Sequence, residues 1–291
     1  MKTAIIGLGL IGGSLAKAFK ARSEDTVYGA DLDHDTLTYA KLSETIDEVL
    51  TDETLTECGL IIIALYPDAT IKWLEANAHL ISKDAFVIDT CGTKRDVCKA
   101  GFEIAKKYGF TFIGGHPMAG TQFSGIKYSR ADLFKGASMV IVPEHLDDMA
   151  LMEKVKELLS PADFGKITPS TAEEHDQIIA FTSQLAHIVS SAYIKSDTAK
   201  VHHGFSAGSY KDMTRVATLN EQMWSTLFLQ NADNLVHELD NIITALDEYR
   251  TAIKNNDRDN LVELLHDGCV CKANVDGGCT TGNVATNKVR S

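Results

Sequence analysis

The sequence predicts an α/β fold, a doubly wound parallel sheet, followed by an all-α domain. Three observations predict it: short apolar runs alternate with amphipathic segments to about residue 169, a glycine-rich turn follows the first run, and long helical patterns come after. Apolar runs separated by helices are typical of a parallel sheet that is covered on both faces. We therefore expect a sheet domain over residues 1–169, a helical domain over 170–268 and a tail over 269–291.

The individual elements follow from these patterns. Strands are expected at 2–6, 26–30, 60–65, 85–89, 111–114 and 138–142, and helices at 12–22, about 171–195, 218–231 and 235–255. Thr171, with Glu174 three residues later, has the capping-box pattern of a helix start. Residues 269–291 are rich in Gly, Thr, Asn and Lys without periodicity, which predicts a disordered tail.

Composition and charge exclude several classes of protein. Among 291 residues, 28 are Lys or Arg and 40 are Asp or Glu, a net charge of −12 that argues against a nucleic-acid partner. The longest wholly apolar run, Leu60–Leu65, is far shorter than the ~20 residues of a membrane-spanning helix. Because a strand pattern begins almost at Met1, no signal peptide is expected, and we expect a cytoplasmic protein with no membrane partner.

The six cysteines are expected to be reduced thiols, because a chain of this length with a large core needs no disulfide framework. Cys269, Cys271 and Cys279 lack a fourth ligand and the usual zinc spacing. We therefore expect no metal site.

A phosphate-binding loop is predicted at Gly7-Leu8-Gly9-Leu10-Ile11-Gly12, which matches G-x-G-x-x-G between a strand and a helix. Asp31 ends the next strand, near the ~20-residue spacing of a carboxylate that binds the ribose hydroxyls of NAD and repels the 2′-phosphate of NADP. We expect NAD as cofactor, with further contacts from residues at later strand ends, namely Leu65, Pro67 and Thr93.

The segment Gly114-Gly115-His116-Pro117-Met118-Ala119-Gly120 places His116 at the carboxyl end of a strand. Open α/β sheets bind ligands at that edge. A neutral imidazole there suits a proton acceptor. His116 is therefore the candidate catalytic residue.

These motifs, over roughly residues 2–265, resemble the prephenate dehydrogenase family of tyrosine biosynthesis, which includes arogenate-using relatives. The resemblance depends on Gly-Leu-Gly-Leu-Ile-Gly-Gly-Ser at 7–14, His-Pro-Met-Ala-Gly at 116–120 and Gly-Ser-Tyr-Lys-Asp-Met-Thr-Arg at 208–215. It implies a Rossmann-type NAD domain, a helical dimerisation domain and a homodimer. It also implies oxidative decarboxylation of prephenate, with NAD taking hydride from the carbon that bears the hydroxyl.

The resemblance also implies which residues bind substrate. Arg215 matches a carboxylate-binding arginine, and His187 matches one of two histidines that share a helix face, the other being replaced by Gln184. The loop after His116 adds three further candidates for substrate binding, Thr121, Gln122 and Ser124.

The sequence departs from the family pattern at a few positions. Gly92 stands where a serine often bonds the catalytic histidine, so we expect Thr93, water or backbone to orient His116 instead. Gln122 replaces a frequent glutamate, and Lys211 stands where arginine is also common.

Other functions stay open. Arogenate dehydrogenase would share the chemistry, and a β-hydroxyacid dehydrogenase would share the glycine loop but not the histidine segment. An NAD-binding regulator without activity is the alternative from another class.

Overall fold

The computed structural model describes residues 1–202, 204–205 and 207–275, which form two compact units, Met1–Leu235 and a second that begins at Val236. The strands are β1 (Lys2–Ile6), β2 (Thr26–Ala30), β3 (Glu48–Val49), β4 (Leu60–Ile63), β5 (Phe86–Asp89), β6 (Thr111–Pro117), β7 (Ser138–Val142) and β8 (Lys166–Pro169). The α-helices are α1 (Leu10–Arg22), α2 (His34–Leu42), α3 (Asp52–Leu55), α4 (Pro67–Asn77), α5 (Arg95–Tyr108), α6 (Met149–Leu158), α7 (Ala172–Ile179), α8 (Ala186–Tyr193), α9 (Gly208–Thr214), α10 (Glu221–Gln230), α11 (Ala232–Lys254) and α12 (Arg258–Val275). Shorter turns of helix are η1 (Ala78–Leu80), η2 (Ile126–Tyr128), η3 (Ser160–Ala162), the π-helical η4 (Ala180–Leu185) and η5 (Asp197–Val201).

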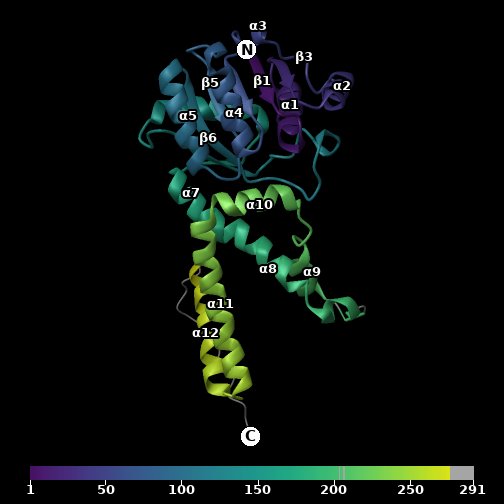
Figure 1. Ribbon diagram of the computed structural model, residues 1–291, viewed down its shortest axis with the longest axis vertical. Coiled ribbons are helices and arrows are strands. Elements are labelled where there is room, and N and C mark those ends of the chain that lie inside the picture. Colours follow the sequence, from purple (N-terminus) through teal and green to yellow (C-terminus); the bar gives the residue numbers. More distant parts are fainter. Residues whose placement is uncertain (203, 206, 276–291) are drawn as a thin grey trace. The chain divides into compact units, whose positions relative to one another are not determined.

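One sheet organises the first unit (Figure 1). Its strand order is β3-β2-β1-β4-β5-β6-β7-β8. All neighbours are parallel except β6 and β7. The order reverses between β1 and β4, and the crevice at such a switch point is where doubly wound sheets bind ligands. The predicted fold class, a Rossmann-type sheet followed by helices, is confirmed.

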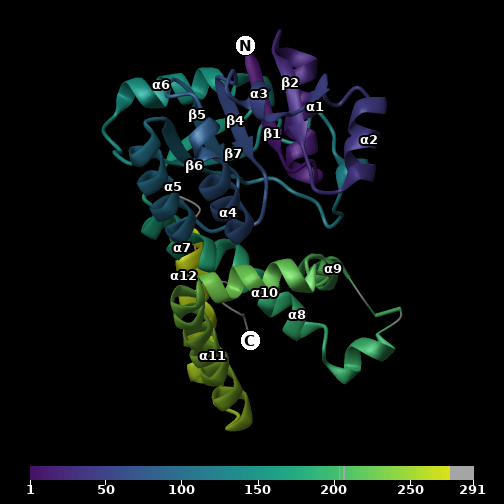
Figure 2. The same cartoon turned by 45° about the horizontal axis from the view of Figure 1, so that its top comes forward.

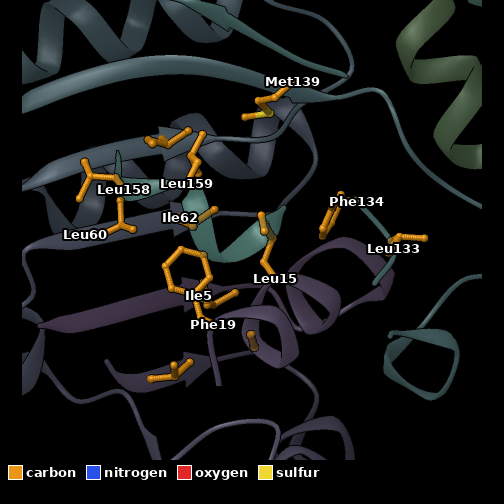
Figure 3. Close-up of a cluster of buried hydrophobic side chains, with 14 of the residues drawn as sticks. Ile5, Leu15, Phe19, Leu60, Ile62, Leu133, Phe134, Met139, Leu158 and Leu159 are labelled. Carbon is orange, nitrogen blue, oxygen red and sulfur yellow. The ribbon is translucent and has the colours of Figure 1, made fainter. Parts of the chain in front are cut away.

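The sheet buries a separate apolar cluster on each face, because alternate residues of a strand point to opposite sides. On one face, Ile5 and Ile62 pack against Leu15 and Phe19 of α1, with α6 beside them, as Figure 3 shows. On the other face, the neighbouring strand residues Ile61 and Ile63 belong to a cluster with α4 and α5. The continuous apolar runs of the sequence thus have two buried faces.

Strand β6 is longer than expected because it changes partner along its length. Residues Thr111–Ile113 pair in parallel with β5, and residues Gly114–Pro117 pair antiparallel with β7. His116 therefore lies inside the ladder, opposite Val140, and not in the loop beyond it. Backbone pairing holds the segment that carries the candidate catalytic residue.

The long helix expected at about 171–195 is present, but a π-helical segment, η4, interrupts it between α7 and α8. The Thr171 hydroxyl accepts a hydrogen bond from the Glu174 amide, so the predicted N-cap is confirmed. π-Helical turns are frequent at functional sites. By contacts, α7 to α10 belong to the same compact unit as the sheet, which ends at Leu235. The domain boundary expected near residue 169 stays a prediction.

The prediction of a tail from residue 269 is wrong for its first residues, because α12 continues to Val275. In the second unit, α11 turns into α12 at Asn256, whose φ of 56° is left-handed, and the Tyr249 hydroxyl donates to the Leu264 carbonyl. Residues 269–275 extend an existing helix, and propagating a helix does not require the costly nucleation step that starts one. Residues 276–291 lie outside the described residues.

Candidate active site

The glycine loop after β1 has the geometry that its motif predicts. Gly7 has a φ of +86°, and a Cβ atom on Gly12 would lie 1.8 Å from the Gly7 carbonyl oxygen, so both positions require glycine. A Cβ on Gly9 would meet nothing within 4 Å, and no side chain caps the N-terminus of α1. The first amides of α1 are therefore available to an anion such as a pyrophosphate.

Asp31 connects the end of β2 to this loop. Its carboxylate accepts hydrogen bonds from the Leu8 amide at 2.7 Å and from the Asp33 amide at 2.9 Å. Leu65 lies against Gly7, and Pro67 is the first residue of α4 at the neighbouring strand end. These predicted cofactor residues thus gather at the crevice between β1 and β4.

A buried ion pair lies beneath His116. The ammonium of Lys94 donates to the Asp89 carboxylate and to the Gly115 carbonyl oxygen, and both charged side chains are inaccessible to solvent. The other oxygen of Asp89 accepts the Gly115 amide at 3.1 Å. Although burial acts to lower it, the Asp89 charge raises the pKa of Lys94. The pair holds the peptide before His116 through its amide and its carbonyl.

His116 contacts a second histidine that the sequence analysis did not select. Its Nδ1 lies 2.8 Å from Nε2 of His175 on α7, and His175 Nδ1 lies 2.7 Å from Oδ1 of Asp176. Our expectation that Thr93 or backbone orients His116 is wrong, because His175 is its partner and the Thr93 hydroxyl donates to Gln230 instead.

The electrostatics keep His116 neutral. Burial lowers its pKa well below the ordinary value, and the charges of His175 and Lys94 act in the same direction. Burial also lowers the pKa of His175, against the opposing effect of Asp176. Despite its own burial, Asp176 has a lowered pKa because His175 and the amides of Arg95 and Lys94 donate to it. Asp176 is therefore a carboxylate that contacts the His175 imidazole, which in turn contacts His116.

Helix α10 lies against the loop after β5 and the start of α4 (Figure 2). The Gln230 amide accepts from the Thr93 hydroxyl at 3.1 Å and donates to Asp68 at 2.9 Å. A Cβ on Gly92 would meet Leu227 at 3.4 Å, an ordinary contact distance. A cavity of about 350 Å³ opens between these elements, lined by Tyr66, Pro67, Asp68, Ala69, Lys72, Gln222, Met223, Thr226 and Leu227.

His187 and Arg215 lie in the same part of the helical segment. The centroid of the His187 ring lies 4.0 Å from that of Trp224, with the two rings tilted by 47°, and His187 Nδ1 donates to the Val216 carbonyl at 3.1 Å. Burial lowers the pKa of His187, and the Arg215 charge adds to this. Arg215 is exposed and has no ion-pair partner among the described residues, so its guanidinium is available to an anion.

Gln184 has a different environment from the one we expected. It is buried, its amide donates to the Leu227 carbonyl, and its carbonyl accepts from Asn231. Both ends of the amide are therefore engaged within the protein, which gives no support to a role in binding substrate.

Thr121, Gln122 and Ser124 are exposed in the loop after β6. The Thr121 hydroxyl bonds the backbone of Phe123, whose ring stacks on Tyr128 at 4.8 Å. Within the described part of the chain, no hydrogen bond joins these three residues to His116. Their role in binding substrate stays a prediction.

Comparison with known proteins places this arrangement in a family. A family model described as the prephenate dehydrogenase nucleotide-binding domain matches residues 15–166, and one described as the prephenate dehydrogenase dimerization domain matches residues 171–267. The chain belongs to the prephenate dehydrogenase family.

Individual proteins of known function and structure that resemble the chain belong to the same family. The chain is 31% identical to prephenate dehydrogenase of Bacillus subtilis, over 90% of this chain and 73% of that protein. It is 30% identical to cyclohexadienyl dehydrogenase of Zymomonas mobilis, over 89% of this chain and 91% of that protein. The structure of Synechocystis arogenate dehydrogenase superposes with a TM-score of 0.76 at 28% identity, covering 95% of this chain and 99% of that one. The chain is thus similar to members of this oxidoreductase family that differ in the substrate they are named for.

Within the described residues, no cluster of His, Cys, Asp and Glu is arranged to hold a metal ion. None of the described helices has both the length and the apolar character needed to cross a membrane.

Sequence reasoning missed four residues of the site: Asp89, Lys94, His175 and Asp176. The signal for His175 and Asp176 was a His-Asp pair directly after the capping-box glutamates, and the signal for Asp89 and Lys94 was a charge at each end of a strand-end loop. Neither signal indicates which distant residue the side chain meets.

We expect Lys94→Met to destabilise the fold strongly, because it leaves the Asp89 carboxylate buried without a counter-charge. Breaking a buried pair in this way typically costs about 3–5 kcal/mol. Urea unfolding should show the loss, and Lys99→Met, a change of an exposed lysine in α5, the helix that Lys94 precedes, should leave stability nearly unchanged. Equal free energies of unfolding for the two variants would contradict the structural role of Lys94.

Proposed function

We propose that this chain catalyses the NAD-dependent oxidative decarboxylation of prephenate to 4-hydroxyphenylpyruvate, with release of CO2 and NADH, in tyrosine biosynthesis. One observation carries the proposal: His116, half-buried on β6 and with a lowered pKa, stands at the carboxyl end of the sheet that also presents the glycine loop. Membership of the family over both matched domains supports it.

The residues at the crevice fit NAD. The open face of Gly9 and the uncapped amides of α1 suit the pyrophosphate, and Asp31 suits the adenosine ribose. When bound, NAD supplies the hydride acceptor. Leu65, Pro67 and Thr93 are proposed to complete its contacts from the neighbouring strand ends.

His116 would hold and return one proton. As hydride leaves the ring carbon, the O–H electron pair becomes part of a carbonyl and the hydroxyl proton passes to the imidazole. Loss of CO2 then returns the pair of electrons from the broken C–C bond to the ring, which becomes aromatic. The phenolate oxygen takes the proton back from His116, so the histidine ends as it began.

Arg215 and His187 are proposed to bind the anionic substrate. Arg215 is an exposed guanidinium without an ion pair in the described part of the chain, and a guanidinium can bind a carboxylate with two parallel hydrogen bonds. His187, whose ring lies against Trp224 and whose pKa the Arg215 charge helps to lower, is proposed to contribute a ring nitrogen. Thr121, Gln122 and Ser124 are proposed to contact the substrate from the loop after β6.

Arogenate is the second candidate substrate, since it differs from prephenate only in an amine at the side chain. The similarity to Synechocystis arogenate dehydrogenase and to a cyclohexadienyl dehydrogenase favours keeping it. The chemistry at His116 would be the same for both.

A homodimer through the helical segment is proposed as well. The dimerization-domain match supports it, and so does a stripe of exposed apolar residues on α11, Val236, Ile243, Leu246 and Ile253. Their spacings of three and seven residues place them on one helix face, as in helix–helix seams.

We also propose that the protein acts in the cytoplasm. The thiols of Cys58, Cys91 and Cys98 are free and buried, as expected in a reducing compartment.

Turnover tests the function directly. The purified chain should reduce NAD with prephenate, and His116→Asn should lower kcat by about 10²–10⁴-fold, the usual contribution of a general base, while still binding NAD. Because the pKa of His116 is lowered, activity should persist below pH 6.5 and be lost only as pH falls through that lowered pKa. NAD binding without turnover of prephenate or arogenate would instead identify a regulator.

Asp31 should set the choice of cofactor. Asp31→Ser is expected to weaken NAD binding, measured by calorimetry, and to raise the ratio of kcat/KM for NADP over NAD, because the 2′-phosphate is no longer repelled. Asp33→Ser, a change of the neighbouring helix N-cap, is a control that should leave this ratio near its original value. Equal kcat/KM for both cofactors in the unaltered protein would contradict the assignment.

Arg215→Ala should raise KM for prephenate roughly 10- to 150-fold, because a charge-assisted hydrogen bond contributes about 1.5–3 kcal/mol. The midpoint of thermal unfolding and NAD affinity should stay nearly unchanged. Lys200→Ala, at another exposed cation of the helical segment, should not change KM. A large fall in the midpoint with an unchanged KM would indicate a structural role.

A further inference from the structure

The contact between His116 and His175 restricts where the hydrogens of both rings can lie. Asp176 accepts from four donors: His175 Nδ1 at 2.7 Å, the Lys94 amide at 2.7 Å, and the Arg95 amide and Nε at 3.0 and 3.3 Å. A carboxylate so surrounded has no hydrogen to give. Nδ1 of His175 must therefore carry a hydrogen and donate it to Asp176.

The remaining nitrogen of His175 is then an acceptor. His175 is buried, and a neutral imidazole with hydrogen on Nδ1 has a lone pair on Nε2. His175 Nε2, which carries this lone pair, lies 2.8 Å from His116 Nδ1, so Nδ1 of His116 must be the donor. A neutral His116 that donates from Nδ1 has its own lone pair on Nε2.

We propose that His175 and Asp176 are positioning residues that hold His116 in the tautomer with hydrogen on Nδ1, which makes Nε2 the atom that takes the substrate hydroxyl proton. The inference deepens the proposed function and depends on it for the identity of the substrate.

The same chain of contacts would stabilise the ring once it is protonated. When the hydroxyl O–H bond breaks, its electron pair stays on oxygen and a new N–H bond forms at His116 Nε2. The imidazolium then donates through Nδ1 to His175, which donates in turn to the negative Asp176. The other charged groups facing this pair are Lys94 and Asp89, which neutralise each other by direct contact.

The ¹⁵N chemical shifts of histidine, measured on the chain without substrate or cofactor, test the tautomer. The His116 signals, identified by their loss in His116→Asn, should show a pyrrole-like Nδ1 and a pyridine-like Nε2 across neutral pH. A pyridine-like Nδ1 would overturn the proposal. Because this measurement needs no turnover, it is independent of whether prephenate is the substrate.

Two substitutions of His175 separate positioning from packing. His175→Phe keeps a ring but removes the acceptor, so His116 should lose its single tautomer and kcat should fall about 10²- to 10⁴-fold with KM within about twofold. His175→Gln keeps an oxygen acceptor near the place of Nε2, so the tautomer should be retained and kcat should fall no more than about 10-fold. His145→Gln, an exposed histidine far along the chain, should behave as the unaltered protein.

Equal losses of kcat in the phenylalanine and glutamine variants, or no loss in either, would overturn the proposal. If His175→Phe fails to fold, the tautomer of the unaltered protein and the retained tautomer in His175→Gln still decide it. Thermal unfolding of each variant shows whether His175→Phe has failed to fold.

Discussion

The buried pair of Asp89 and Lys94 is the interaction on which the site depends. Together the two side chains bond the amide and the carbonyl of Gly115, the residue before His116. A charged pair without solvent access is stable only when its remaining hydrogen-bonding groups are satisfied, and here the backbone of β6 and the Cys91 amide satisfy them. The bonds that stabilise these buried charges therefore also fix the position of the strand that carries His116.

Asp176 joins the sheet to the helices that follow it. Its two oxygens accept the Lys94 and Arg95 amides at the N-terminus of α5, where no side chain of the helix itself acts as a cap. A carboxylate at that end is favoured by the helix dipole. Because the same group also bonds His175, the capping of α5 and the orientation of the histidines depend on one side chain. Arg95 extends the connection to Asn231 and Asp233.

The residues around His116 and the residues proposed to bind substrate differ in burial and in the number of their hydrogen bonds. On the sheet side, Asp89, Lys94 and Asp176 are buried and fully bonded. On the other side, Arg215 is exposed and the loop with Thr121 to Ser124 is exposed as well. This division suits a reaction in which the proton acceptor must be positioned accurately in advance, while the groups that bind a small anion remain open to it.

The sequence by itself determined the sheet, the glycine loop, Asp31 at the second strand end and His116 near the end of the sixth strand. These are local signals: apolar runs, the conformations that only glycine allows, and a fixed spacing along the chain. It did not determine that β6 continues through His116, since that depends on pairing with β7. Only the tertiary structure decided that His175, 59 residues away, orients His116, and that Gln184 is engaged by α10 and Asn231. The physical reason is that a hydrogen bond between distant segments depends on how their backbones pack, and a chain with ten histidines and many carboxylates offers far more pairs than the fold can bring together.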